Sequence, residues 1–235
     1  MKDKVALVMG GGAGTGRATV MAFAREGARV AIADINQEGG EESLEQLRQR
    51  GGEGIYLRCD MGSAEDVEEV IARTRESFGA LHLVSNNAAL AAPNKPVTEL
   101  TEAEWDRCMG VTLKGVWLCM QRQLPLIEAS GGGAIVNVAS VSGIRGEVFQ
   151  SAYAAAKGGV ITLSKAVAAA YAKRGVRVNT GCPGGINSGG MQFYLDRMPV
   201  MREMTLNAHA MGRLAEPEVL ADSGVSGSSV RATVW

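Results

Sequence analysis

Short runs of apolar residues alternate along the chain with longer segments in which apolar and polar residues recur at helical spacing. The apolar runs predict six β-strands, at residues 5–9, 29–33, 54–58, 81–85, 134–139 and 177–180. Intervening segments such as 64–78 and 101–118 predict amphipathic helices. Strands that are apolar on both faces are typical of a parallel sheet covered by helices on both sides, so we expect a doubly wound α/β fold. Ligands of such folds bind beyond the carboxyl ends of the strands.

Composition narrows the classes of protein that the chain can represent. Its 235 residues, 46% of them hydrophobic, suffice for one domain over residues 1–235. A formal net charge of −1, with both signs spread along the chain, provides no basic field for nucleic acid or an anionic membrane. No apolar run approaches the roughly 20 residues of a membrane span, and the first residues do not resemble a signal peptide. We therefore expect a cytoplasmic protein.

The cysteines and histidines show no metal-binding pattern. The four cysteines lie in apolar surroundings without a CxxC spacing, so we expect reduced thiols and neither a disulfide nor zinc. His82 falls inside the fourth predicted strand and His209 lies beyond the sixth. Neither has acidic or cysteine neighbours at ligand spacing, so we expect structural roles for both.

Three glycines, Gly10, Gly14 and Gly16, directly follow the first predicted strand and precede a helical segment that begins at Arg17. Their spacing alone is weak evidence in a chain with 31 glycines, but their position makes it strong. Glycine lets the backbone turn tightly and approach a pyrophosphate, whose charge is held by free amides and the positive end of the helix. The pattern predicts a dinucleotide site rather than an ordinary glycine-rich turn.

Asp34 ends the second predicted strand, 18 residues after Gly16, where a carboxylate accepts hydrogen bonds from the adenosine ribose. A 2′-phosphate would bring about two negative charges against it. Ile35 offers no compensating cation, and Arg17 is the nearby basic candidate. The cofactor that this pattern predicts is NAD, and the alternative is a solvated carboxylate at a strand end.

Polar residues also close the third and fourth predicted strands. Asp60 either meets the adenine amino group or caps a turn. Asn86 and Asn87 either fix neighbouring backbones and border the cofactor or serve as turn residues.

Tyr153 and Lys157 are four residues apart on a helix predicted to begin near Ser151, so their side chains share one face. At about 6 Å and an effective dielectric constant of about 20, the ammonium favours the phenolate by about 3 kcal/mol, or about two pKa units. Tyr153 then serves as general base in alcohol oxidation and general acid in ketone reduction, while Ser140 hydrogen-bonds the substrate oxygen. The alternative is a half-buried surface pair with Ser140 in a turn.

These motifs resemble those of the short-chain dehydrogenase/reductase family, over residues 4–217. The resemblance rests on the glycine turn, Asp34, Asp60, the NNAA stretch at 86–89, Ser140, Tyr153, Lys157 and the CPGG stretch at 182–185. It implies a Rossmann-like domain without a metal, a homo-oligomer (tetramer or dimer), and a mobile lid from Gly185 to about Met211. The cofactor contacts that it implies are Gly10, Gly14, Thr15, Gly16, Asp34, Ile35, Asp60, Met61, Asn87, Ala88, Tyr153, Lys157, Pro183, Gly184 and Ile186.

Two positions depart from the family pattern near the site. The NNAG motif ends here in Ala89, whose methyl group lies where the backbone approaches the cofactor and predicts a modest loss of affinity. Thr112 replaces an asparagine that completes a water-linked proton relay to the lysine. Because threonine is shorter and has no amide, a further water must bridge the gap. We expect Thr112 to belong to a weakened relay and Thr112→Asn to raise turnover.

The end of the chain departs further. After Glu216 the family continues with an apolar helix and a seventh strand, whereas residues 223–229 are flexible in composition and only 230–235 alternate like a short strand. We therefore expect no such helix, an atypical or missing seventh strand, and an exposed sheet edge that disturbs the oligomer. Apolar lid residues suit a hydrophobic alcohol or form a plain packing face: Met191, Phe193, Tyr194, Met198 and Met201.

The motifs predict an NAD-dependent oxidoreductase that transfers a hydride between the cofactor and a small hydrophobic secondary alcohol or ketone. One alternative is an NADPH-dependent 3-oxoacyl reductase, which shares the fold and the catalytic residues but is disfavoured by Asp34. An alternative of another class is a former enzyme kept for nucleotide binding. Thr112 and the altered tail favour it, and the pair of Tyr153 and Lys157 disfavours it.

Overall fold

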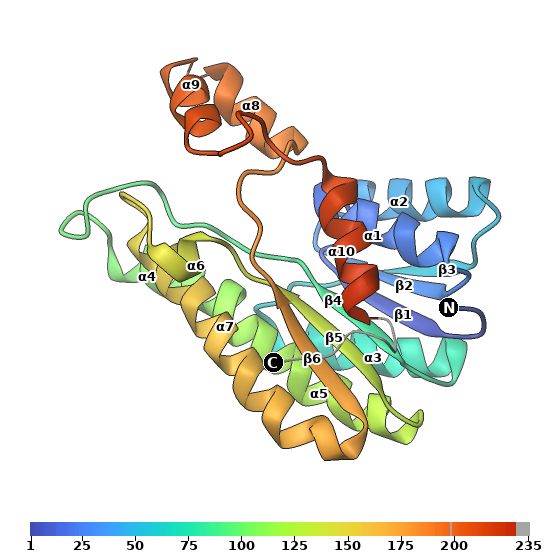
Figure 1. The fold of residues 1–235 in the computed structure, drawn as a ribbon. Coiled ribbons are helices and arrows are strands. Elements are labelled where there is room, and N and C mark those ends of the chain that lie inside the picture. The colour runs from blue at the N-terminus through green and yellow to red at the C-terminus, as the bar shows by residue number, and fades with distance from the viewer. Residues whose placement is uncertain (198, 229–235) are drawn as a thin grey trace.

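A parallel β-sheet forms the centre of the molecule (Figure 1). The computed structural model describes residues 1–197 and 199–228. Within them the strands are β1 (Val5–Met9), β2 (Arg29–Asp34), β3 (Gly54–Arg58), β4 (Leu83–Asn86), β5 (Gly133–Val138) and β6 (Val176–Gly181). Their order is β3-β2-β1-β4-β5-β6, and every pair is parallel. All six predicted strands are confirmed, with ends that differ by no more than two residues.

Helices cover both faces of the sheet, as predicted (Figure 1). One face carries α1 (Gly14–Arg25), α2 (Gln37–Gln49) and α10 (Pro217–Ser228). The other carries α3 (Ala64–Phe78), α5 (Gly115–Ala129) and α7 (Ser151–Tyr171). The remaining helices are α4 (Glu102–Met109), α6 (Ser142–Arg145), α8 (Gly189–Arg197) and α9 (Pro199–Asn207), with a π-helical turn η1 (Gly110–Lys114) and a 3₁₀ turn η2 (Ala172–Arg174). No helix among these is long and apolar enough to cross a membrane.

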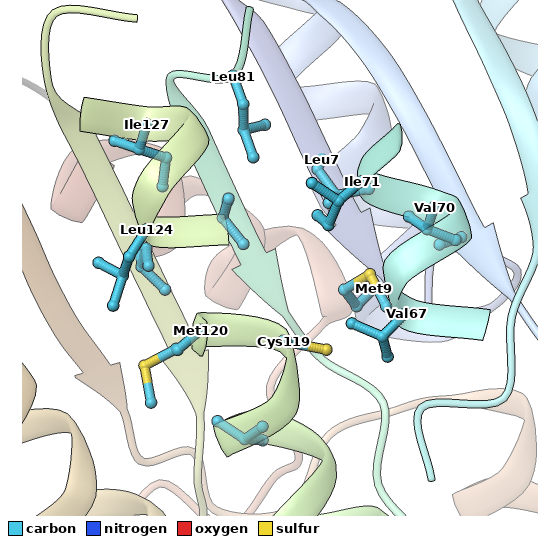
Figure 2. Packing of buried hydrophobic residues seen from close by; sticks show 14 of the residues in the cluster. Leu7, Met9, Val67, Val70, Ile71, Leu81, Cys119, Met120, Leu124 and Ile127 are labelled. Carbon is cyan, nitrogen blue, oxygen red and sulfur yellow. The ribbon is translucent and has the colours of Figure 1, made fainter. Parts of the chain in front are cut away.

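The two faces explain why the strands are apolar throughout. Leu7 and Met9 of β1 point toward α3 and α5, where Val67, Val70 and Ile71 meet them at helical spacing (Figure 2). Ala6 and Val8 alternate with them and pack on the other face, against α1 and α2. A strand buried on both sides has no position for a solvated side chain.

The predicted helix 101–118 is longer and less regular in the structure. Thr101 and Glu104 form a capping box at the start of α4, in which each side chain accepts a backbone amide of the other residue. The helix then widens into the π-helical turn η1 before it continues as α5 to Ala129. Such π-helical turns frequently occur at functional sites, and this one contains Thr112.

The expectation that no helix follows Glu216 is wrong, because α10 extends from Pro217 to Ser228. Proline is well suited to the first helical position. Leu220, Ala221 and Val225 recur on one face and pack on α1 and the sheet, and this tertiary contact outweighs the weak helix propensity of glycine and serine. The predicted strand at residues 230–235 lies outside the described residues.

The lid segment, residues 185–211, leaves the sheet after β6 and contains α8 and α9. In Figure 1 these two helices lie apart from the sheet, beyond the carboxyl ends of its strands. The segment returns beside its own start, where Ile186 forms a parallel bridge with Ala215. Leu195 of α8 is buried, and Met198 lies outside the described residues.

Candidate active site

The glycine turn between β1 and α1 is built by close backbone approaches. Gly10 has φ +79°, and a Cβ atom there would lie 2.6 Å from the backbone nitrogen of Ala88. A Cβ on Gly16 would lie 1.8 Å from the carbonyl oxygen of Gly10. Neither position has room for a side chain, so the turn holds β1, α1 and the segment after β4 together.

The amino end of α1 satisfies one requirement of an anion site. Its N-cap residue, Ala13, provides no side-chain hydrogen bond to the first turn, and no acidic residue lies in that turn. The first amides of a helix have no partner within the helix and carry its positive end. The amides of Gly14, Thr15 and Gly16 are therefore suited to a pyrophosphate.

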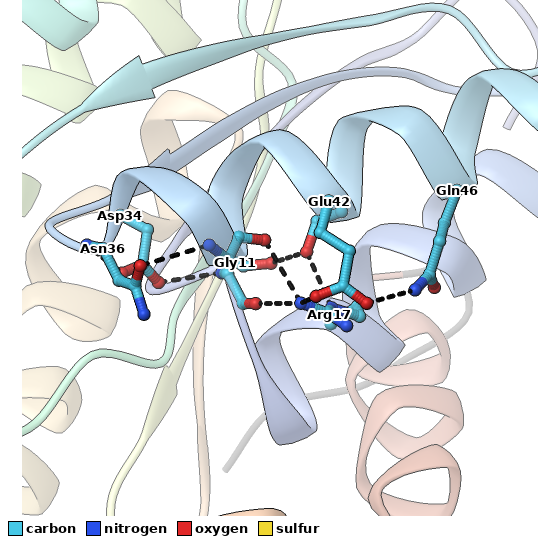
Figure 3. A network of polar contacts seen from close by, with 9 residues as sticks. Gly11, Arg17, Asp34, Asn36, Glu42 and Gln46 are labelled. Atoms are coloured by element: carbon cyan, nitrogen blue, oxygen red, sulfur yellow. Dashed lines mark hydrogen bonds and ion pairs between the residues drawn. The ribbon is translucent and has the colours of Figure 1, made fainter.

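Asp34 is held at the end of β2 by two backbone amides (Figure 3). Its Oδ2 accepts from the nitrogen of Gly12 at 2.8 Å, and its Oδ1 accepts from that of Asn36 at 2.9 Å. A Cβ on Gly12 would lie 2.8 Å from the carboxyl carbon of Asp34. Each carboxylate oxygen keeps a second lone pair, so the group can still accept from a ribose hydroxyl. The sequence reasoning missed Gly12, although it stands inside the GGGAG run.

Arg17, the basic candidate near Asp34, is engaged elsewhere (Figure 3). Its Nη2 donates to the carbonyl oxygen of Gly12 at 2.6 Å and to Oε2 of Glu42 at 2.7 Å, and its Nε donates to Oγ of Ser43 at 2.9 Å. Arg17 lowers the pKa of Glu42 through this bond. The guanidinium joins α1 to α2, while Ile35, the residue after Asp34, is 56% exposed.

Asp60 and Asn87 differ in how their side chains are used. Asp60 Oδ1 accepts from the nitrogen of Gly62 at 2.8 Å, which is the turn-capping alternative. Asn87 donates through Nδ2 to Oγ of Ser85 at 3.0 Å. Its buried Oδ1 has no hydrogen-bond partner in the described part of the chain, so an unused acceptor lies beside the glycine turn.

Asn86 belongs to a buried amide network that links β4 to its neighbours. Its Nδ2 donates to Oδ1 of Asn137 on β5 at 2.7 Å, and its Oδ1 accepts from Nε2 of Gln123 on α5 at 2.9 Å. Asn137 in turn donates to Oγ of Ser164 on α7 at 2.9 Å. The role foreseen for the asparagine pair in fixing neighbouring elements therefore falls to Asn86.

Tyr153 and Lys157 share a face in the first turns of α7, next to the end of β5. The Nζ atom of Lys157 lies 5.6 Å from the centre of the Tyr153 ring and donates to the carbonyl oxygen of Val138 at 2.5 Å. Ser140 follows two residues later, and its Oγ accepts from the nitrogen of Ser142 at 3.1 Å. The carbonyl of Val138, which sequence reasoning missed, ties the lysine to the strand end that carries Ser140.

Burial dominates the electrostatics of this pair. Lys157 is 1% exposed, and burial lowers its pKa to about 8. Burial also raises the pKa of Tyr153 to about 12, followed by smaller effects of Cys108 and Glu147. The sequence argument expected the ammonium to lower the pKa of Tyr153, whereas the loss of solvent around the phenol raises it and Lys157 is not among the groups that shift it. Among the chain's own groups, Tyr153 thus keeps its proton at neutral pH.

Thr112 takes a different place from the one expected. It is 0% exposed, and its Oγ donates to the carbonyl oxygen of Leu90 at 2.8 Å while accepting from the nitrogen of Leu90 at 2.9 Å. The single hydroxyl proton is thus used by Leu90 and not by a water. Thr112 fastens the segment after β4 to η1. Ala89, the other departure, is exposed, and the close approach to Gly10 comes from Ala88 instead.

The remaining predicted positions follow the strand ends. Met61, the residue after Asp60, is buried. The carbonyl oxygen of Pro183 accepts from the nitrogen of Val141 at 3.0 Å. Gly184 directly precedes the lid segment, and Ile186 is its second residue. All four cysteines are free thiols, and the described residues contain no group of three or more potential metal ligands.

Comparison with known proteins agrees with this geometry. Residues 4–198 match the family described as short chain dehydrogenase. The chain belongs to the short-chain dehydrogenase family. Members of this family are oxidoreductases that bind a nicotinamide cofactor, and the relatives of this chain act on alcohols.

Two relatives in the short-chain dehydrogenase family cover nearly all of the chain. A 2,5-dichloro-2,5-cyclohexadiene-1,4-diol dehydrogenase of Sphingobium indicum is 37% identical over 96% of this chain and 89% of its own length. A cyclohexanol dehydrogenase of Acinetobacter sp. is 35% identical over 93% of this chain and 85% of its own.

Solved structures of the family share the fold. The crystal structure of levodione reductase superposes with a TM-score of 0.92 at 31% identity, over 98% of this chain and 94% of that one. A variant of actinorhodin polyketide ketoreductase with NADPH superposes with a TM-score of 0.90 at 27% identity, over 97% and 90%.

Proposed function

We propose that this chain is an NAD-dependent dehydrogenase of small hydrophobic secondary alcohols, rings among them, that also reduces the corresponding ketones. The observation that carries the proposal is the placement of Lys157 between the Tyr153 ring and the end of β5, directly before Ser140. The names of the relatives, a cyclohexadiene-diol dehydrogenase and a cyclohexanol dehydrogenase, support ring alcohols.

The residues around the glycine turn fit a dinucleotide. The first amides of α1 would hold the pyrophosphate and Asp34 the adenosine ribose, while the free acceptor of Asn87 lies nearby. Bound NAD supplies the hydride acceptor and a positive nicotinamide ring. One domain, residues 1–235, carries the cofactor and the catalytic residues in this proposal, and the subunits form a homo-oligomer.

The preference for NAD rests on charge. A 2′-phosphate would place about two negative charges against Asp34. Arg17 cannot compensate without giving up its bonds to Gly12, Ser43 and Glu42. Ile35 stands where a cation would be needed. A ribose diol, by contrast, donates to the free lone pairs of the carboxylate.

Tyr153 would transfer the proton of the reaction. Its raised pKa keeps the phenol protonated at neutral pH, ready to donate to the oxygen of a ketone as that oxygen becomes an alcohol. In oxidation the phenol must first lose its proton to solvent, which the ammonium of Lys157 and the positive nicotinamide ring of bound NAD would favour, and the phenolate then accepts the alcohol proton. Ser140 donates a hydrogen bond to the substrate oxygen.

The segment between Ser140 and Tyr153 is mixed in character and includes the ion pair of Arg145 and Glu147. Between Ser140 and Tyr153, the side chains of Ile144, Val148 and Phe149 are 67%, 78% and 54% exposed. Exposed apolar side chains of this kind often mark a surface that binds an apolar partner or ligand. This supports a hydrophobic alcohol.

The experiment is a fluorescence titration with NAD(H) and NADP(H), followed by turnover measurements on secondary alcohols that include cyclohexanol. We expect NADH to bind at least about tenfold more tightly than NADPH, because like charges at close range cost more than 1.4 kcal/mol. Asp34→Ala combined with Ile35→Arg should reverse the preference. Equal affinities in the native chain would contradict the role of Asp34. Binding without turnover of any alcohol or ketone would favour a non-catalytic nucleotide-binding protein.

A further inference from the structure

His209 joins the two ends of the lid segment. It follows α9 on the returning part of the chain, and its ring makes two hydrogen bonds. Its Nδ1 lies 2.7 Å from the carbonyl oxygen of Thr205 in α9, and its Nε2 accepts from the backbone nitrogen of Gly185 at 2.7 Å. Gly185 lies at the start of the lid segment, next to Pro183 and Gly184.

These two partners define the protonation state of the ring. A carbonyl oxygen can only accept, so Nδ1 must carry the hydrogen that Thr205 receives. A backbone amide can only donate, so Nε2 must keep its lone pair for Gly185. The imidazole that satisfies both partners is neutral and protonated on Nδ1. A second proton on Nε2 would face the N–H of Gly185.

The backbone beneath the ring is shaped to receive it. A Cβ on Gly184 would lie 2.9 Å from Nε2, and a Cβ on Gly185 would lie 3.0 Å from Cε1 of the ring and 2.6 Å from Cδ2 of Leu214. Two successive glycines therefore allow His209 to approach the chain that leads from β6 into the lid segment.

The other contacts at this place are between backbone atoms, apart from the hydrogen bond that the side chain of Asn187 donates to Glu216 at 2.9 Å. Ala215 donates to the carbonyl oxygen of Gly185 at 3.1 Å, and Asn187 donates to that of Ala215 at 2.8 Å. His209 adds a side-chain contact that can be broken by a proton. The point where the lid segment joins the sheet, below α8 and α9 in Figure 1, thus contains a titratable group.

We propose that neutral His209 is a positioning residue that holds the ends of the lid segment against Gly184 and Gly185, and that its protonation releases Gly185. The consequence for catalysis rests on the proposed function, because Pro183 and Gly184 are expected cofactor contacts. Binding of the cofactor then weakens when the ring is protonated, while the proton transfer by Tyr153 is unaffected.

Charged groups near the ring have partners of their own. On the returning chain, Arg213 donates to the carbonyl oxygen of Leu214 and Glu216 accepts from Asn187. On α9, Arg202 pairs with Asp196, and Glu203 is exposed. The thiol of Cys182 precedes Pro183, and burial raises its pKa. His209 itself contacts neutral backbone groups.

The first experiment reads the ring directly, without catalysis. The chain has two histidines, and the structure assigns them opposite tautomers, because Nδ1 of His82 accepts from the nitrogen of Val5 at 3.1 Å. Two-bond ¹⁵N–¹H NMR correlations of the ¹⁵N-histidine-labelled chain at pH 8 should show one ring protonated on Nε2 and one on Nδ1. The signals of the latter should vanish in His209→Gln. A His209 ring protonated on Nε2 would overturn the proposal.

The second experiment uses two matched variants and the native chain. His209→Gln retains an acceptor for Gly185, whereas His209→Asn retains a donor for Thr205 but cannot reach Gly185. We expect the KM for NAD in His209→Asn to rise about two- to tenfold, as for the loss of one hydrogen bond, with little change in kcat. The KM of His209→Gln should stay near the native value at pH 8.

The pH profile separates positioning from a purely structural role. As the pH is lowered, protonation of the ring should raise the native KM toward that of His209→Asn. Both variants should lack this rise. An equal KM in the two variants, or a native profile that they share, would overturn the proposal. If no alcohol is turned over but the tautomers are as assigned, the proposed function fails and the contact with Gly185 stands.

Discussion

The carboxyl ends of β2 and β5 hold their charged groups in opposite ways. Asp34 is half-buried and accepts two backbone amides. Lys157 is buried, its ammonium donates to the carbonyl of Val138, and none of the described ion pairs includes it. Asp34 is therefore a group that the fold stabilises. Lys157 is a group whose charge the fold opposes, as its lowered pKa shows.

This difference corresponds to the roles proposed for the two residues, cofactor binding for Asp34 and support of proton transfer for Lys157. A group that only recognises a cofactor can have its interactions satisfied in advance. A group that must influence a proton transfer works best when its pKa lies near neutrality, and burial is the means of moving it. In this comparison Lys157 costs stability through its burial, whereas Asp34 contributes stability through its two hydrogen bonds.

The largest effect should come from Tyr153→Phe, which removes only the oxygen that transfers the proton. We expect turnover to fall by about 10²- to 10⁴-fold, because this is the usual contribution of a positioned acid or base. The affinity for NADH should change by less than about twofold, since the ring remains in place. Steady-state kinetics and a fluorescence titration measure the two quantities. Turnover above a few per cent of the native rate would place the acid or base elsewhere.

The second prediction compares Lys157 and Asp34 directly through the free energy of unfolding. A pKa of about 8 instead of 10.5 corresponds to roughly 3 kcal/mol opposing the charged form of Lys157. Lys157→Met should therefore raise the free energy of unfolding at pH 7 by about 1–3 kcal/mol while it abolishes turnover. Asp34→Ala should lower it by about 1–2 kcal/mol, because two hydrogen bonds to a charged group are lost. Urea denaturation measures both.

The pH dependence of the free energy of unfolding tests the same property of Lys157. The folded chain releases the proton of Lys157 near pH 8, whereas the unfolded chain keeps it to about pH 10.5, so the unfolded state binds more protons between these values. The free energy of unfolding of the native chain should therefore gain a contribution that increases as the pH rises from about 8 to about 10.5. Lys157→Met should lack that contribution. If the free energy of unfolding depended on pH in the same way in the native chain and in Lys157→Met, the claim that the charge of Lys157 is opposed by burial would be wrong.

The smallest effect on turnover is expected at Thr112. Thr112→Val keeps the shape but leaves the N–H and the carbonyl of Leu90 without partners, and should lower the free energy of unfolding by about 1–3 kcal/mol. Thr112→Asn carries both a donor and an acceptor. The equilibrium constant of unfolding and the turnover rate should therefore each stay within about twofold of the native values. A large rise in turnover with a changed solvent deuterium isotope effect would instead favour the relay expected from the sequence.

The sequence predicts those parts of the molecule in which local pattern and tertiary contact agree. The apolar strands, the glycine turn, and the spacing of Tyr153 and Lys157 depend on residues close together in the chain. Their placement follows from the two periodicities of strand and helix. The side-chain roles of the cofactor residues remain predictions, since the structure shows their protein contacts alone.

The sequence fails where distant contacts decide. The helix α10 forms on weak helix formers because α1 and the sheet bury one of its faces. The pKa of Tyr153 depends on how completely the surrounding chain excludes water, which no spacing reveals. Thr112 meets Leu90 across 22 residues, so its partner is visible only in three dimensions.

The buried amide network around Asn86 bears on how the sheet finds its alignment during folding. Parallel strands joined by long crossovers pair late and through contacts far apart in sequence. A shift of β4 against β5 would separate Asn86 from Asn137 and leave buried amides without partners, at a cost of about 1–3 kcal/mol for each. Apolar side chains would tolerate such a shift more readily, because their attraction has no direction. These polar groups therefore distinguish the native alignment of the two strands from its near alternatives.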